Sequence, residues 1–185
     1  MSSTILSTKK LSASQQELLL NAGLGFVHYN AIETACLSAD LPKDHNSYIF
    51  TSQNAVRCIL RQFPKAKKFS AFCVGSKTAQ YLARQGFEVL EYADNARSLA
   101  HKIVKQYPHY HFLHPCGTLR RLDLASILKE NEVRYTALII YETILKETRF
   151  ERQFDGVLFF SPSGVKSYVQ QSDKAQSIAF CIGET

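Results

Sequence analysis

The chain repeats one local pattern, a β-strand that runs into a hydroxyl-bearing turn and then into a helix. The segment at positions 49–56 (IFTSQNAV) recurs at 159–165 (FFSPSGV), and the segment at 72–76 (FCVGS) recurs at 180–184 (FCIGE). Two motifs that repeat in the same order at nearly the same spacing indicate an internal duplication. The repeat therefore predicts two similar α/β halves.

Strand and helix patterns alternate along the chain, which is typical of parallel sheets covered by helices. Five strands and four helices are expected between Ser47 and Tyr141, enough for one complete doubly wound domain. The strands expected outside this stretch, at 4–7, 25–30, 155–161 and 177–182, belong to a second domain. We therefore predict an α/β fold of two flavodoxin-like, doubly wound parallel-sheet domains.

This order of elements also predicts the domain boundaries. The complete, inserted domain is expected at residues 38–141, and the discontinuous domain at residues 1–33 and 148–185. Extended segments at 31–37 and 142–148 would join them as a two-stranded β linker. Because the second copy of the repeat breaks off at Thr185, we expect this domain to be truncated by roughly 35–60 residues. A domain that ended there would expose apolar sheet surface.

Local signals predict individual element ends. Ser12 or Ser14 is the expected N-cap of a helix that ends at Asn21, because hydroxyl side chains accept hydrogen bonds from the free N–H groups of a first turn. A strand is expected at 110–114 and a helix at 119–131.

Composition excludes several classes of protein. The five cysteines are scattered, odd in number and never in C-x-x-C spacing, which argues against a disulfide framework or a zinc site and fits a reducing compartment. No apolar run reaches the ~20 residues of a membrane span, and the N-terminus has no signal-peptide pattern. A cytoplasmic protein with no membrane partner is therefore expected.

The net charge is +6, from 22 basic and 16 acidic residues. No basic stripe with interleaved aromatic residues and no nucleic-acid-binding motif occurs, so no nucleic-acid partner is expected. The charge is compatible with plain solvated lysines and equally with a ligand rich in carboxylate or phosphate groups.

The turns after the predicted strands contain the candidate binding residues. Ligands of open parallel sheets bind outside the carboxyl ends of the strands, and helix N-termini there favour anions. Simple N-capping remains an alternative explanation for each turn. No G-x-G-x-x-G, P-loop, G-x-S-x-G or H-E-x-x-H motif occurs. The turns are at 51–54, 75–78, 115–120 and 161–164.

The sequence resembles the uroporphyrinogen-III synthase family. The matching segments run in order over essentially the whole chain, at 49–56, 74–79 with 86–87, 115–121, 141–143, 159–165 and 182–183. The resemblance implies two α/β domains joined by a two-stranded linker, with a cleft for hydroxymethylbilane, a linear tetrapyrrole with eight carboxylate side chains.

The resemblance also implies an activity. The family dehydrates and cyclises hydroxymethylbilane with inversion of ring D to give uroporphyrinogen III in porphyrin and heme biosynthesis, which makes it a hydro-lyase. It needs no metal or organic cofactor. A monomer is expected, and transient contact with hydroxymethylbilane synthase is left open.

Site residues follow from the same resemblance. Tyr141 matches a family tyrosine and is the expected general acid, although packing at the linker is an equal alternative. The expected substrate-binding residues are Lys9, Thr51, Ser52, Gln53, Gly75, Ser76, Thr78, Cys116, Gly117, Arg120, Ser161, Ser163 and Gly164.

The chain departs from the family pattern in two places. Thr8-Lys9 stands where a Thr-Arg pair is common, which keeps the charge but loses bidentate carboxylate geometry. The expected counterpart of Thr78 would lie one residue beyond Thr185. Two other hypotheses remain: a non-catalytic two-domain protein that binds a small anionic ligand, and a partner-binding flavodoxin-like fragment.

Overall fold

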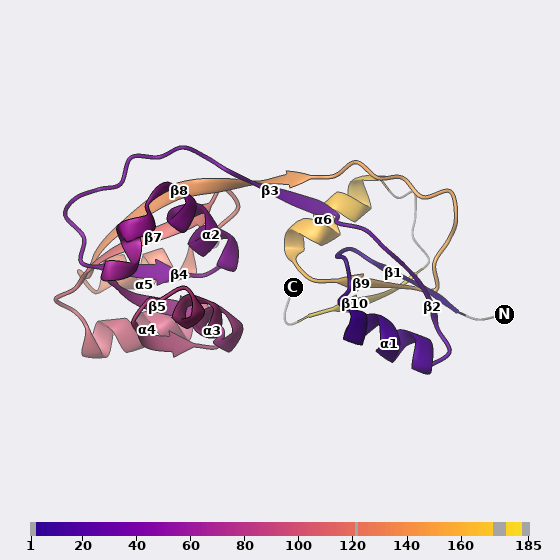
Figure 1. The fold of residues 1–185 in the computed structure, drawn as a ribbon, viewed down its shortest axis with the longest axis horizontal. Coiled ribbons are helices and arrows are strands. Elements are labelled where there is room, and N and C mark those ends of the chain that lie inside the picture. The colour runs from indigo at the N-terminus through magenta and orange to yellow at the C-terminus, as the bar shows by residue number, and fades with distance from the viewer. Residues whose placement is uncertain (1–2, 121, 172–176, 183–185) are drawn as a thin grey trace. The chain divides into compact units, whose positions relative to one another are not determined.

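A computed structural model describes residues 3–120, 122–171 and 177–182. The chain divides into two compact units. The inserted unit is Thr34–Glu142, and the terminal unit combines Met1–Glu33 with Thr143–Thr185. Each unit has its own sheet with parallel strands and covering helices (Figure 1). The predicted α/β class with alternating strands and helices is therefore confirmed.

The inserted unit is built on a six-stranded sheet with the order β3-β8-β7-β4-β5-β6. Parallel pairing joins β4 to β5 and β7, β5 to β6, and β7 to β8. The strands are β3 (Ile32–Cys36), β4 (Ser47–Phe50), β5 (Ser70–Val74), β6 (Val89–Ala93), β7 (His111–Gly117) and β8 (Arg134–Leu145). From β4 the chain adds β5 and β6 on one side, then crosses to β7 and β8 on the other. The strand order therefore reverses between β4 and β7.

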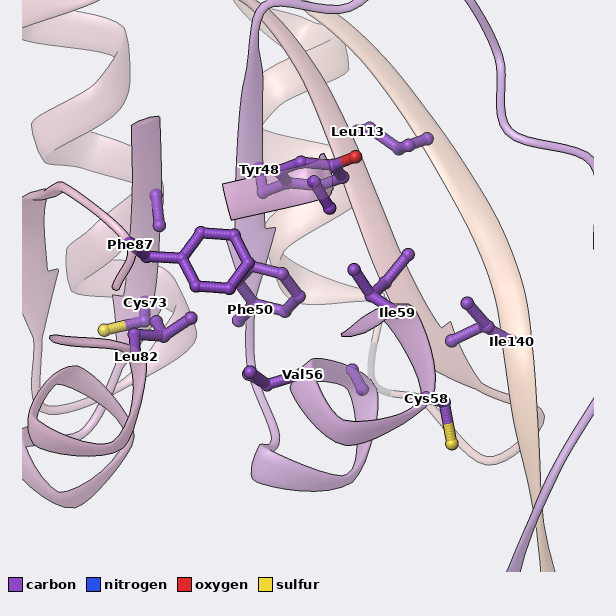
Figure 2. Packing of buried hydrophobic residues seen from close by; sticks show 13 residues of the cluster. Tyr48, Phe50, Val56, Cys58, Ile59, Cys73, Leu82, Phe87, Leu113 and Ile140 are labelled. Atoms are coloured by element: carbon purple, nitrogen blue, oxygen red, sulfur yellow. The ribbon is translucent and has the colours of Figure 1, made fainter. Parts of the chain in front are cut away.

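Alternation along β4 divides the core of this unit into two layers. Tyr48 and Phe50 pack in one cluster with side chains of α2 (Gln53–Gln62) and α3 (Ser76–Arg84). Ile49 packs in the opposite cluster with side chains of α4 (Ala96–Gln106) and α5 (Asp123–Glu130). In Figure 2 the rings of Phe50 and Phe87 lie edge to face, with centroids 5.5 Å apart. All four residues of β4 are buried, as expected of a central parallel strand.

The terminal unit has a four-stranded parallel sheet with the order β10-β9-β1-β2. Its helices are α1 (Ala13–Asn21) and α6 (Pro162–Gln171), and Leu6, Val157 and Phe159 form its core with Phe154 and Tyr168. Ser12 caps α1 in a capping box with Gln15, as one of the two predicted caps. No residue of α1 is buried and all four residues of β10 are exposed. Its strands are β1 (Thr4–Ser7), β2 (Gly25–His28), β9 (Gly156–Phe159) and β10 (Ile178–Cys181).

Two predicted element ends are wrong around residue 115. Strand β7 continues to Gly117 instead of ending at His114, and α5 begins at Asp123 instead of Leu119. The pairing between β4 and β7 stops at Leu113, whereas β7 stays paired with β8 through Gly117. The end of β7 therefore behaves as an edge, where Pro115 is tolerated without its N–H donor. A short 3₁₀ helix at Pro64–Lys68 was also not predicted.

The expectation that the cysteines form no disulfide was wrong for one pair. Cys36 at the end of β3 is bonded to Cys58 of α2, with their Cα atoms 5.5 Å apart. Strand β3 lies at the edge of the sheet next to β8. The two residues are 22 positions apart in the chain, so no local spacing motif could reveal that the fold brings them together.

One histidine is buried at the core of the inserted unit. His114 of β7 is 2% exposed. Its Nδ1 lies 2.5 Å from the hydroxyl of Tyr135 on β8, and its Nε2 lies 3.1 Å from Oγ1 of Thr51, directly after β4. Burial lowers the pKa of His114 to about 4, and the positive charge of Arg120 acts in the same direction. The imidazole is therefore neutral at pH 7.

We expect Cys36→Ser to lower the free energy of unfolding by about 3 kcal/mol under oxidising conditions, because a disulfide restricts the unfolded chain by closing a loop of this length. Cys36 is exposed, so the substitution leaves the core intact. Urea unfolding with and without reductant measures the effect. Equal stability of the wild type in both conditions would contradict the prediction.

We also expect acid to destabilise the protein through His114. In the unfolded chain His114 takes up a proton near pH 6.5, and in the folded chain only near pH 4. The stabilisation that depends on a neutral His114 is therefore fully present above pH 6.5 and is lost as the pH falls to 4. The loss amounts to about 3 kcal/mol.

Urea unfolding at pH 7 and pH 4.5 measures this loss, with His114→Gln as the matched control. Burial also lowers the pKa of His45, and carboxylates titrate in the same range, so the difference between wild type and variant isolates His114. An identical pH dependence for both proteins would count against the burial of a neutral His114.

Candidate functional site

A pocket of about 370 Å³ opens in the inserted unit at the carboxyl ends of β4, β5, β6 and β7. This is the edge of the sheet where the strand order reverses, and open α/β sheets bind their ligands at such a point. The residues that line the pocket are Thr51, Ser52, Val74, Asp94, Asn95, Ala96, His114, Gly117, Leu119, Arg120, Leu124 and Tyr141.

Five residues predicted from the sequence come together in this pocket: Thr51, Ser52, Gly117, Arg120 and Tyr141. Arg120 provides a fixed positive charge. Its Nε atom is buried and has no hydrogen-bond partner among the described residues. A buried donor without a partner costs free energy unless a ligand or water satisfies it. Because Arg120 lines the pocket, its positive charge favours an anion there.

The turn after β4 supplies two hydroxyl groups. Oγ of Ser52 accepts a hydrogen bond of 3.1 Å from the backbone N–H of Asn54 and so caps α2. Because this oxygen is the acceptor, the Ser52 hydroxyl proton remains available to another group. The predicted residue Gln53 points elsewhere: its Nε2 donates to the carbonyl of Lys77, 3.1 Å away, and links the first turns of α2 and α3.

The position of the Tyr141 ring requires a glycine at residue 117. A Cβ atom built at Gly117 would lie 2.6 Å from Cζ of Tyr141, closer than side-chain atoms can approach. The N–H of Thr118 donates to the Tyr141 carbonyl at 3.1 Å. The absence of a side chain at residue 117 therefore lets the Tyr141 ring lie against the end of β7 and form one wall of the pocket.

The turn after β6 contributes Asp94, Asn95 and Ala96 to the pocket and was not predicted from the sequence. Oδ1 of Asn95 accepts a 2.8 Å hydrogen bond from the N–H of Ser98 and caps α4. Ligands of open parallel sheets bind outside the carboxyl ends of the strands, and this turn also follows such an end. This turn was overlooked because it has no hydroxyl side chain and no counterpart in the repeat.

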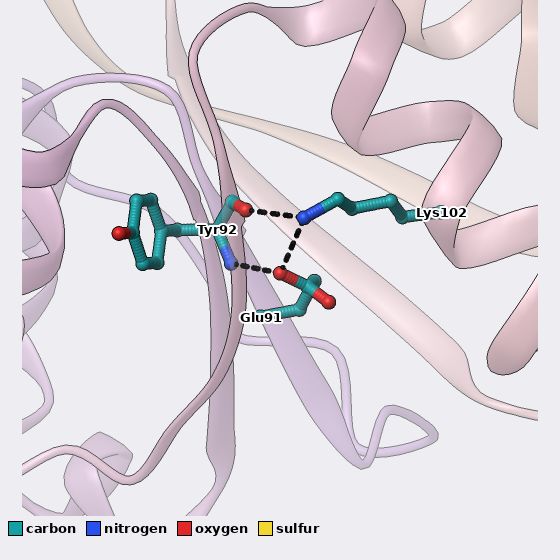
Figure 3. A network of polar contacts seen from close by, with 3 residues as sticks. All are labelled: Glu91, Tyr92 and Lys102. Atoms are coloured by element: carbon teal, nitrogen blue, oxygen red, sulfur yellow. Dashed lines mark hydrogen bonds and ion pairs between the residues drawn. The ribbon is translucent and has the colours of Figure 1, made fainter.

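An ion-pair network holds this turn in place. Nζ of Lys102 on α4 lies 2.9 Å from Oε1 of Glu91 and 3.1 Å from the carbonyl oxygen of Tyr92, both on β6 (Figure 3). The same Glu91 oxygen accepts a hydrogen bond from the Tyr92 N–H, and its hydrogen bond raises the pKa of Lys102. The network joins β6 to α4 on both sides of the loop that lines the pocket.

Besides Gln53, four predicted residues of the inserted unit do not line this pocket: Gly75, Ser76, Thr78 and Cys116. Gly75 has a φ of +85°, which favours glycine, and it precedes the first turn of α3. Thr78 is buried in that turn. Cys116 is also buried, and burial raises the pKa of its thiol, while the charge of Arg120 opposes the rise. Its Sγ contacts the Leu138 carbonyl at 3.5 Å.

The remaining predicted residues lie in the terminal unit. The N–H of Gly164 donates to Oγ of Ser161 at 3.1 Å in the turn after β9. A Cβ at Gly164 would lie 3.3 Å from Oγ1 of Thr8, so the turn is packed closely against the end of β1. Nζ of Lys9 lies 5.9 Å from the ring centroid of Phe160. Ser163 is partly exposed in the first turn of α6. The counterpart of Thr78, expected next to Thr185, lies outside the described residues.

Within the described part of the chain, no group of three or more His, Cys, Asp or Glu side chains could hold a metal ion. None of the helices there is long and apolar enough to cross a membrane.

The fold is similar to that of solved structures described as uroporphyrinogen-III synthases. The structure of uroporphyrinogen-III synthetase from Helicobacter pylori superposes with a TM-score of 0.74 at 18% identity, covering 99% of this chain and 84% of the other. A mutant uroporphyrinogen III synthase from Thermus thermophilus gives a TM-score of 0.64 at 13% identity, covering 97% and 84%. At these identities the likeness supports the fold alone.

Sequence comparison supports the same family. No curated protein sequence gives a significant match. The model of the family described as uroporphyrinogen-III synthase HemD, however, matches residues 13–185, nearly the entire chain. The chain therefore belongs to the uroporphyrinogen-III synthase family.

Proposed function

We propose that this chain is a uroporphyrinogen-III synthase, a hydro-lyase that closes hydroxymethylbilane into uroporphyrinogen III in heme biosynthesis. The main supporting observation is the pocket at the switch point of the inserted unit, where Arg120 and the hydroxyls of Thr51 and Ser52 surround Tyr141. This set of groups suits a ligand with many carboxylates, and the family match supports hydroxymethylbilane as that ligand.

Arg120, Thr51 and Ser52 would bind a carboxylate arm of the substrate. A guanidinium binds carboxylates through two parallel hydrogen bonds, and hydroxyl donors add direction. The pocket volume of about 370 Å³ is near the lower end for small-molecule sites. It would therefore hold one part of the linear tetrapyrrole, such as a pyrrole ring with its acidic arms.

Tyr141 would assist the departure of the terminal hydroxyl group by donating a proton to it. The ring that loses hydroxide becomes transiently cationic. Asp94 on the wall of the same pocket supplies a negative charge that would stabilise this cation. Inversion of ring D requires that the ring be held in one orientation during closure, which is a matter of proximity and geometry.

We further propose that the protein acts as a monomer in the cytoplasm and receives its substrate from hydroxymethylbilane synthase. Hydroxymethylbilane closes spontaneously to the isomer without inversion, so transfer through transient contact would limit that loss. In a reducing cytoplasm the thiols of Cys36 and Cys58 would remain largely unbonded.

The central prediction concerns the product isomer. Purified protein given hydroxymethylbilane is expected to form uroporphyrinogen III, which chromatography of the oxidised products separates from isomer I. If only isomer I forms, at the rate seen without protein, the proposed function is wrong.

Tyr141→Phe is expected to lower kcat while KM for hydroxymethylbilane stays within about threefold of wild type, because the phenol proton is lost and the ring stays in place. The loss should be about 10²-fold, the lower end for general acid catalysis. Tyr81→Phe, a tyrosine on α3 outside the pocket, is the matched control.

Gly117→Ala tests the same role without removing the hydroxyl group. The added Cβ would displace the Tyr141 ring, so kcat should fall although Tyr141 is present. Gly25→Ala, whose Cβ would make an ordinary 3.5 Å contact with Thr4, serves as the control. Wild-type turnover in both Tyr141→Phe and Gly117→Ala would remove Tyr141 from the mechanism.

A further inference from the structure

We propose that His114 is a positioning residue that, with Tyr135 behind it, fixes the Thr51 hydroxyl as a hydrogen-bond donor to a substrate carboxylate. The inference rests on the proposed function, since it assigns the polarity of one group in that binding pocket. It gives a task to two residues, His114 and Tyr135, that the sequence did not single out.

The three side chains form a continuous line across three adjacent strands. Tyr135 lies on β8, His114 on β7, and Thr51 directly after β4, and these strands are neighbours in the sheet. The Tyr135 hydroxyl is 2.5 Å from Nδ1 of His114, and Nε2 of His114 is 3.1 Å from Oγ1 of Thr51. Thr51 and His114 both line the pocket, but Thr51 is partly exposed whereas His114 is almost completely buried. His114 therefore acts on a ligand through Thr51.

Hydrogen-bond donors and acceptors along the line have one consistent assignment. Within the described residues, His114 is the only hydrogen-bond partner of the Tyr135 hydroxyl. Tyr135 is partly buried, and the short contact with Nδ1 needs one proton between the two atoms, so we assign that proton to the Tyr135 hydroxyl. With Nδ1 as the acceptor, the proton of a neutral imidazole is on Nε2. Nε2 then donates to Oγ1 of Thr51.

The protonation state of the imidazole agrees with this assignment. A cationic His114 would have protons on both nitrogens and could not accept from Tyr135. Burial and the charge of Arg120, the charged group that faces the ring, both lower the pKa of His114, to about 4. Burial also raises the pKa of Tyr135, which keeps its hydroxyl protonated as a donor. At neutral pH the ring therefore has one N–H group.

The consequence lies at Thr51. Because Oγ1 of Thr51 accepts a hydrogen bond from His114, its own proton must point to another acceptor. Thr51 is partly exposed and borders the pocket that Arg120 also lines. The hydrogen bonds from Tyr135 through His114 thus fix the Thr51 hydroxyl as a donor, in a pocket that also contains the positive charge of Arg120. Such a pair favours a carboxylate over a neutral group that itself needs an acceptor, such as an amide N–H.

The tautomer can be measured without any ligand. Protein labelled with ¹⁵N-histidine is recorded in a two-bond ¹H–¹⁵N correlation spectrum at pH 7, and His114→Gln assigns the His114 signals. The proposal expects the neutral tautomer protonated at Nε2. A tautomer protonated at Nδ1, or a cationic ring, would overturn it.

A double-mutant cycle tests the effect on binding. Thr51→Val and His114→Leu are each expected to raise KM for hydroxymethylbilane about tenfold, the usual effect of losing one hydrogen bond to a charged group. If His114 acts through Thr51, the double variant should be no worse than Thr51→Val alone. His114→Gln, which retains an N–H near the position of Nε2, should restore KM to within about threefold of wild type. The kcat values should change less than KM.

Two outcomes of this cycle contradict the proposal. One is a further large rise in KM when His114→Leu is added to Thr51→Val, and the other is an equal defect in His114→Gln and His114→Leu. If His114→Leu does not fold, Tyr135→Phe replaces it, because it removes the donor to Nδ1. Its effect on KM should likewise vanish in the Thr51→Val background, and persistence there would overturn the proposal.

The proposed function and the positioning role fail separately. If the wild type forms no isomer III, the same cycle is run on the Kd for uroporphyrin I, a stable octacarboxylate, measured by its fluorescence. The same non-additivity is expected there. Absence of wild-type binding to this probe would leave Thr51 without a carboxylate partner and would refute the positioning role as well.

Discussion

Burial of strand β4 on both faces is the constraint on which the inserted unit depends. Its side chains alternate between two cores, with Tyr48 and Phe50 facing α2 and α3, and Ile49 facing α4 and α5. A parallel strand buried in this way requires helices on both sides. Helices reach both sides because the chain builds outward from β4 in two directions. The reversal of direction leaves the pocket at the end of β4, so the packing that stabilises the unit also places Thr51 and Ser52.

The polar groups of the site depend on this rigid frame. Thr51, His114 and Tyr135 lie on three neighbouring strands whose spacing is held by backbone hydrogen bonds. A buried imidazole is destabilising unless both ring nitrogens have partners, and here both do. Gly117 on β7 and Tyr141 on β8 also depend on this frame, because the Tyr141 ring occupies the space that a side chain at residue 117 would fill.

Much of the site could be predicted because the rule for parallel sheets depends only on where strands end. Thr51, Ser52, Gly117 and Arg120 follow predicted strands, and they line the pocket together with Tyr141, which was expected from the family resemblance. The same rule placed Gly75 and Thr78 at a strand end, yet they lie outside this pocket. Strand order, which decides which ends meet, is a property of the tertiary structure. His114 was missed because a histidine within a strand has no local sign of its hydrogen-bond partners.

The sequence by itself determined the alternation of strands and helices, the duplication that produces two sheets, and the Ser12 cap, since each depends on residues close together in the chain. Only the tertiary structure decided that Cys36 meets Cys58, that β7 continues past Pro115, and that Tyr135, His114 and Thr51 form one line of hydrogen bonds. Such contacts join residues distant in the chain. They arise from the order in which strands pair and helices cover them, because burial is shared among all the elements at once.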